Sequence, residues 1–288
     1  MKKFALPLFF GALLASAQMS IQPLTNSSYR GQGDAQGNSW GTLSITLRTP
    51  VPPALLGAPF SAKEERKSEQ LLPEGGRLTL PSSTGVTVSR DALGRTRLER
   101  SLSQVLSSIP GRPAQIPLMI VEINDVVDGY YYVLDPAKKI AYRMKYSPAQ
   151  PRSIPVSATP RGFQVKGALI PGGSAENAPQ INVEPLGSKY IQGVQAEGLR
   201  QTTVYPVGSR GNDRPMTDVN ETWTVPSLQL QILQSSKTPT SNTTFELTNL
   251  STLNPTPDQF RPPPSYEVRD QPESFTVEFG NRPPGTQR

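Results

Sequence analysis

The side chains that could do chemistry in this chain are carboxylates, Lys, Tyr and Ser, because the sequence contains no His and no Cys. Their absence excludes the usual general base, the Ser-His-Asp triad, thiol nucleophiles and the imidazole and thiolate ligands of most zinc, copper and iron sites. Hydrolysis by paired carboxylates stays open. The acids available for it are Asp125, Asp128, Asp135, Glu184, Glu197 and Glu221. None stands in a pattern that distinguishes a catalyst from a turn residue or a surface charge, so we predict no catalytic residue, no cofactor and no metal site.

A basic segment offers a binding surface for an anionic partner. Residues 138–166 contain seven Lys and Arg residues and no Asp or Glu. They are Lys138, Lys139, Arg143, Lys145, Arg152, Arg161 and Lys166. Such a cluster attracts anionic lipid headgroups, polysaccharide or nucleic acid, although charged runs more often form a solvated surface. For a ligand site in this region, Arg152, Arg161 and Lys166 are the expected rim.

Aromatic residues offer a second kind of ligand contact. In the strand expected at residues 130–134, Tyr130 and Tyr132 face one side of the sheet and Tyr131 the other, because side chains alternate along a strand. Tyr130, Tyr132 and Tyr142 are therefore candidates for a ligand wall or for the core. Packing across strands is the commoner use of such rings.

The segment 124–129, Asn-Asp-Val-Val-Asp-Gly, has the acids of a calcium loop without its spacing. Val126 stands where an EF-hand loop needs an oxygen ligand, and no Glu follows at the required position. We predict a hairpin turn here.

Alternating apolar residues separated by turn signals predict a mainly β chain with an antiparallel sheet. Residues 85–90 and 95–100 flank a turn closed by Gly and should form a hairpin. Residues 118–123, 130–134 and 140–146 should form a β-meander. The other strands are expected at residues 41–49, 181–183, 190–199, 202–205, 219–225, 228–233, 243–250 and around 275–279.

Three segments have a less regular pattern. Residues 60–72 suit either a helix, with Ser61 and Glu64 as a capping box, or an exposed or edge strand. Apolar residues between 98 and 109 recur at helical spacing ahead of a Pro-Gly pair, which predicts a short helix. Residues 147–180 are rich in Pro and Gly, and form either a linker or a movable loop over a site.

The first residues are typical of a secretory signal peptide. Two lysines precede an apolar run at residues 4–14, and Ala-Ser-Ala follows. We expect cleavage before Gln18 and a mature protein that is exported to the bacterial periplasm or beyond and does not span a membrane. Its remaining 27 basic and 23 acidic side chains give a net charge of +4, too small to predict a nucleic-acid partner. The expected organisation is a signal peptide (1–17), a flexible arm (18–40), one β-rich domain (41–269) and a tail (270–288).

The last third of the chain resembles a known family. Trp223, Pro226 and Leu228 precede two alternating strands, and Phe260 and Tyr266 lie in the segment that follows them. Over residues 186–268 this pattern resembles the C-terminal hairpin and closing segment of the lipoprotein-carrier-like (LolA-type) periplasmic half-barrels and of related uncharacterised exported proteins. The resemblance implies a structural role for these five residues. It also implies a curved antiparallel sheet, an unclosed barrel with one or two short helices, whose concave face can hold an acyl chain.

From these features we expect an exported, non-enzymatic envelope protein that binds an apolar or amphipathic ligand, such as a lipid or an acylated protein. A structural or sensory module that binds another envelope protein is the alternative, and a carboxylate-dependent hydrolase is a third hypothesis. A cavity with apolar walls would favour the first, a filled core with an exposed apolar patch the second, and converging carboxylates in a cleft the third.

Overall fold

The computed structural model describes residues 23–33, 39–72, 75–80, 85–102, 117–152, 163–166 and 178–280. These residues form β-strands, with two short 3-10 helices between strands, η3 (Pro226–Leu228) and η4 (Pro257–Phe260). The sheets are largely antiparallel and do not close into a barrel, so the predicted fold class is confirmed. Among the helices described, none is long and apolar enough to cross a membrane.

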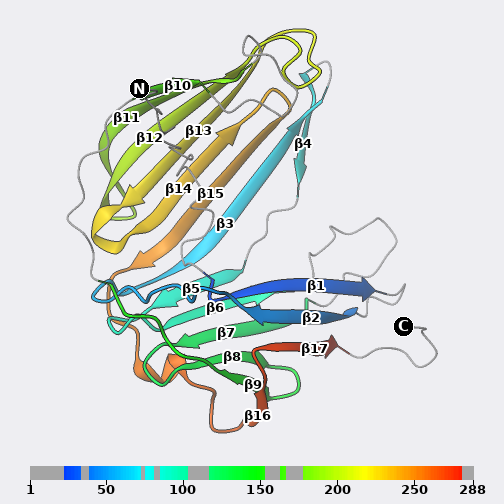
Figure 1. Cartoon of the computed structure of the whole chain (residues 1–288), viewed down its shortest axis with the longest axis vertical. Helices are drawn as coiled ribbons and strands as arrows, with labels where there is room; N and C mark the ends of the chain where they lie inside the picture. Colours follow the sequence, from blue (N-terminus) through cyan, green and yellow to red (C-terminus); the bar gives the residue numbers. More distant parts are fainter. Residues whose placement is uncertain are drawn as a thin grey trace, which may run out of the picture.

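Most strands belong to one 14-stranded sheet, which falls into two groups in Figure 1. The upper group in that view has the order β10-β11-β12-β13-β14-β15-β3, with β4 paired to β3. Its strands are β10 (Phe163–Lys166), β11 (Gln180–Ile191), β12 (Val194–Tyr205), β13 (Met216–Val225), β14 (Leu230–Lys237), β15 (Ser241–Ser251), β3 (Phe60–Leu71) and β4 (Arg77–Leu80). β11 and β12 form one long hairpin that turns at Gln192 and Gly193, both at positive φ, where the sequence predicted three shorter strands.

The long strand β3 joins the two groups. One edge pairs with β15, while the other pairs with β5 (Val86–Arg90) near its start and with β4 near its end. Its charged run is therefore a strand, as one of the two alternatives predicted, and the helix was wrong; the strand is paired on both sides and is not an edge strand. Cross-strand pairing on both sides stabilises a segment that has few apolar residues of its own.

The lower group continues the sheet in the order β5-β6-β7-β8-β9-β16. Its remaining strands are β6 (Thr96–Ser101), β7 (Met119–Asp125), β8 (Tyr130–Asp135), β9 (Ile140–Lys145) and β16 (Glu267–Gln271). The predicted hairpin, β5–β6, and the predicted meander, β7–β8–β9, are confirmed. β16 pairs with β9 in the parallel direction.

A second, three-stranded sheet has the order β1-β2-β17 and joins the two ends of the described chain. Its strands are β1 (Thr25–Gly33), β2 (Ser39–Leu47) and β17 (Ser274–Gly280). Strands thus occupy parts of both the expected flexible arm at residues 18–40 and the expected tail at residues 270–288. The sequence did not predict β1 because most of its residues are polar. Pairing with β2 along its whole length holds this strand in place.

Three apolar clusters hold the sheets together. The sandwich core packs the three-stranded sheet against the lower group and includes Leu43, Ile45, Ile120, Tyr131, Val133, Phe275 and Phe279. The outer core covers the opposite face of the lower group and consists of Val121, Ile123, Tyr132, Leu134, Ala141 and Phe260. The junction core lies where the two groups meet and includes Phe60, Ala62, Val88, Trp223, Val225, Leu228, Ile232 and Leu247.

The motif residues of the C-terminal third lie in these cores. Trp223 and Leu228 are buried in the junction core, and Pro226 opens η3 between β13 and β14. Phe260 is fully buried, and the half-buried Tyr266 packs beside it in the outer core. Trp223, Leu228 and Phe260 are therefore core residues, and the structural role expected of all five residues stays a prediction.

The helix expected between residues 98 and 109 is wrong at its start. Leu98 belongs to β6, where it pairs with Val88 on one side and Glu122 on the other. Residues 103–110 lie outside the described residues, as do the expected signal peptide and most of the segment 147–180, of which β10 is a described part.

Candidate functional site

The tyrosines predicted to line a ligand site are divided between the two faces of the lower group. Tyr130 and Tyr132 pack on the outer-core face with their ring centroids 6.0 Å apart, and the Arg143 guanidinium lies 4.8 Å from the Tyr130 ring centroid. Tyr142 packs against the sandwich core on the opposite face. The structure therefore does not bring these three rings together.

The three predicted rim residues are not assembled into a site by the described residues. Arg152 forms a β-bridge with Leu55, and its backbone N–H donates to the Ala54 carbonyl at 2.9 Å. Lys166 belongs to β10, the edge strand of the upper group. Arg161 lies outside the described residues.

A cavity of about 430 Å³ lies between residues 23–27, at the start of β1, and the sheet formed by β3 and β5–β8. Leu24, Val88 and Leu98 contribute apolar side chains to its walls. Arg100, Glu122 and Tyr131 contribute polar side chains. These side chains share one face of the sheet because side chains alternate between the two faces along a strand. Leu98 and Arg100 are two residues apart on β6, and Leu98 pairs directly with Glu122 on β7.

The polar wall is a hydrogen-bonded chain of buried groups that ends at the half-buried Arg100. The Tyr131 hydroxyl donates to Glu122 Oε1 at 2.6 Å, and Arg100 Nε donates to Glu122 Oε2 at 2.6 Å. Thr25 Oγ1 donates to the Tyr131 hydroxyl oxygen at 3.3 Å, which links this chain to β1. Glu122 is only 8% exposed, so these partners replace the hydrogen bonds that water would give its carboxylate.

Burial and charge act on the pKa values of the groups around Glu122. Burial, followed by the negative charge of Glu122, raises the pKa of Tyr131 well above its ordinary value. For Arg100, burial acts to lower the pKa, but the neighbouring Glu122 carboxylate outweighs it and raises the pKa. Tyr131 is therefore a neutral donor and Arg100 a permanent cation at neutral pH.

The start of β1 closes one side of the cavity. Leu24 is buried in the sandwich core, and its carbonyl accepts the backbone N–H of Arg48 at 3.0 Å. Arg48 Nη1 also donates to the Pro23 carbonyl at 3.3 Å. These contacts fix residues 23–27 over the cavity as a wall, which we name the β1 strap.

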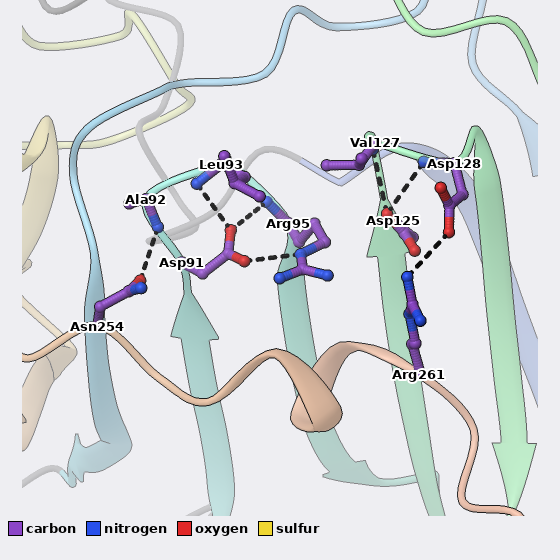
Figure 2. Close-up of polar contacts among 9 residues, drawn as sticks. All are labelled: Asp91, Ala92, Leu93, Arg95, Asp125, Val127, Asp128, Asn254 and Arg261. Carbon is purple, nitrogen blue, oxygen red and sulfur yellow. Dashed lines mark hydrogen bonds and ion pairs between the residues drawn. The ribbon is translucent and has the colours of Figure 1, made fainter.

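A second group of acids lies at the turns of the lower group, where Figure 2 shows Asp91 and Asp125. Asp91 Oδ1 accepts the backbone N–H groups of Leu93 and Arg95, and Asp91 Oδ2 accepts Arg95 Nε at 2.7 Å. Asp125 Oδ1 accepts the N–H groups of Val127 and Asp128, as a hairpin turn requires. These carboxylates are used to hold their own turns.

The segment after β15 ties the same turns together. Asn254 Oδ1 accepts the Ala92 N–H at 2.9 Å, and Arg261 Nη2 contacts Asp128 Oδ2 at 3.3 Å (Figure 2). Asp135 repeats the arrangement by accepting the N–H groups of Ala137 and Lys138. In the part of the chain that the structure describes, no three Asp or Glu side chains are grouped so that they could hold a metal ion.

Sequence reasoning missed the residues that the cavity unites. Glu122 could have indicated a buried polar site, because it is a carboxylate inside the largely apolar strand Met119–Asp125. Arg100 and Tyr131 gave no comparable signal, since their proximity to Glu122 depends on the pairing of β6, β7 and β8. No family model matches the chain, and a comparison with curated proteins finds no match either.

Proposed function

We propose that this protein is an exported, non-enzymatic binding protein of the cell envelope that holds an amphipathic ligand, of the lipid or acylated-protein class, in the cavity beneath the β1 strap. The observation that carries the proposal is the cavity itself. Its volume of about 430 Å³ falls in the range of small-molecule sites. Its walls combine apolar side chains with a few fixed polar groups, as such sites do.

The two kinds of wall have different roles in this proposal. Leu24, Val88 and Leu98 would contact the apolar part of the ligand and remove it from water. Arg100 and Glu122 would orient its polar end, because their mutual contact already fixes them in position. The resemblance of residues 186–268 to lipoprotein carriers supports the same class of ligand.

The experiment is isothermal titration with alkyl ligands in which only chain length changes, repeated for fatty acids, alkanols and lysolipids. Each added methylene should strengthen binding by about 0.8 kcal/mol, or about fourfold in Kd, until the cavity is full. Affinity should then level off.

A pair of variants locates the binding site. Leu98→Trp places a larger side chain in the cavity wall and should abolish binding, whereas Leu253→Trp changes a leucine that is 79% exposed and should leave it intact. Weak binding that is independent of chain length for every headgroup would contradict the proposal. It would favour the interaction-module hypothesis.

A further inference from the structure

The charges in the cavity walls restrict which polar end a ligand can carry. Glu64, Arg100 and Glu122 are the Asp, Glu, Lys and Arg side chains among the described residues that line the cavity. Two carboxylates therefore face one guanidinium. The resulting formal charge of the walls is negative.

The one cation of the walls is already engaged. Arg100 Nε lies 2.6 Å from Glu122 Oε2, with the Glu122 side chain 9% exposed. An anionic ligand would have to compete with a buried carboxylate for this guanidinium. Removing Glu122 from its partner would leave an uncompensated buried charge, which is strongly unfavourable.

The second carboxylate lies on β3. Glu64 Oε1 contacts Arg66 Nη2 at 3.1 Å, and the Glu64 side chain is 12% exposed. Arg66 is half exposed, lies over the Phe245 ring and is not among the described residues that line the cavity. Glu64 therefore lines the cavity with a carboxylate, and the guanidinium that pairs with it lies outside the described lining.

We propose that the ligand of this cavity has a polar end that is not anionic and donates hydrogen bonds to the Glu64 and Glu122 carboxylates. This inference rests on the proposed function and names its ligand class, an apolar chain that ends in a hydroxyl or ammonium group. Carboxylate oxygens accept such donors with short, charge-assisted bonds. A carboxylate or phosphate end meets carboxylates of like charge and binds more weakly.

The test compares decylamine, decanol, decanoate and decyl phosphate at neutral pH, by titration below the concentrations at which they form micelles. The amine and the alcohol should bind roughly tenfold more tightly than the two anions, which is the effect of one hydrogen bond to a charged group. Comparing decylamine with decanol shows which hydrogen-bond donor, ammonium or hydroxyl, the cavity prefers. An ammonium is preferred if decylamine exceeds decanol in affinity.

A variant of Glu64 tests whether the cavity wall causes the preference for a ligand that is not anionic. Glu64→Gln removes one carboxylate at nearly constant shape and should reduce the ratio of amine to carboxylate affinity by roughly tenfold. The control is Glu65→Gln, the next residue of β3, which changes the net charge equally but does not line the cavity among the described residues. It should leave the ratio unchanged.

The outcomes separate the inference from the proposed function. Tighter binding of decanoate or decyl phosphate than of decylamine and decanol, with chain-length dependence intact, would overturn the inference and leave the proposed function standing. An equal loss of preference in Glu64→Gln and Glu65→Gln would also overturn it, because the effect would then come from net charge alone. Failure of all four ligands to bind would overturn both.

Discussion

Tyr131 and Glu122 lie on neighbouring strands, and the Tyr131 hydroxyl donates to Glu122 Oε1 at 2.6 Å on the cavity side of the lower group. The flanking Tyr130 and Tyr132 face the other side and pack in the outer core. Three consecutive tyrosines thus lie on two different faces of the sheet, because side chains alternate along a strand. The middle ring is the one that contacts the candidate site.

Replacing Tyr131 by Phe should destabilise the protein. The change removes the hydroxyl that satisfies a buried carboxylate, which costs about 1–3 kcal/mol of the free energy of unfolding. Urea denaturation of Tyr131→Phe and of the control Tyr130→Phe, whose ring is half-buried in the outer core, measures the difference. Equal stability of the two variants would mean that the Tyr131–Glu122 hydrogen bond contributes nothing.

Stability should also fall at high pH because of Tyr131. Burial raises its pKa in the folded protein above the ordinary value of about 10, so the folded state retains the phenol proton more tightly than the unfolded state. Tyr131 therefore contributes its full stabilisation below about pH 10. That contribution is lost as the pH rises above this value, by up to about 1.4 kcal/mol per pH unit.

Denaturation curves across this alkaline range provide the measurement. Tyr131→Phe should show a shallower loss of stability with pH than the parent protein. Tyr190→Phe removes a phenol that is 77% exposed and should follow the parent curve. Parallel curves for all three proteins would contradict the assignment.

The two ion pairs of Figure 2 should differ in their contribution to stability. Asp91→Ala breaks a buried pair and leaves Arg95 uncompensated, which should cost about 3–5 kcal/mol. Asp128→Ala breaks an exposed pair with Arg261 and should cost about 0–1 kcal/mol. Thermal and urea denaturation of the two variants will show whether loss of the buried ion pair lowers stability more than loss of the exposed one. A cost for Asp128→Ala as large as that for Asp91→Ala would contradict the prediction.

The sequence predicted those strands whose apolar residues alternate. The meander of β7, β8 and β9 and the hairpin of β5 and β6 were found because each strand packs an apolar face and each turn carries Asp or Gly. β1 was not predicted, and β3 was predicted only as an alternative to a helix, because both are polar and are held in place by pairing with neighbouring strands. β3 pairs with β15, which is more than 170 residues later.

The cavity could not be predicted for the same reason. Thr25, Arg100 and Tyr131 come from three strands, and each is ordinary in its own segment. Only the pairing of β6 with β7 and of β7 with β8, and the packing of β1 over them, bring these side chains together. The basic segment was the stronger sequence signal, yet its described residues Arg152 and Lys166 belong to different elements, a bridge with Leu55 and the edge strand β10.

Trp223 and Phe260 should be anchors of the fold. Trp223 is 7% exposed in the junction core and Phe260 is fully buried in the outer core. Truncation of either residue to Ala should cost about 3–5 kcal/mol. Leu253→Ala, at an exposed position, should change stability by less than about 0.5 kcal/mol. Losses below about 1 kcal/mol for both aromatic variants would show that these rings do not hold the cores.

Gly198 is predicted to be required by the ring of Trp223. A Cβ at position 198 would lie 2.7 Å from two ring atoms of Trp223 and 2.9 Å from the Leu186 Cβ, too close without movement. Gly198→Ala should therefore cost about 1–3 kcal/mol. Gly76→Ala, where the nearest atom would be 3.5 Å away, is the control and should be tolerated. A double-mutant cycle completes the test, because Trp223→Phe shortens the ring and should recover part of the loss caused by Gly198→Ala. Strictly additive losses would show that the ring and the glycine are independent.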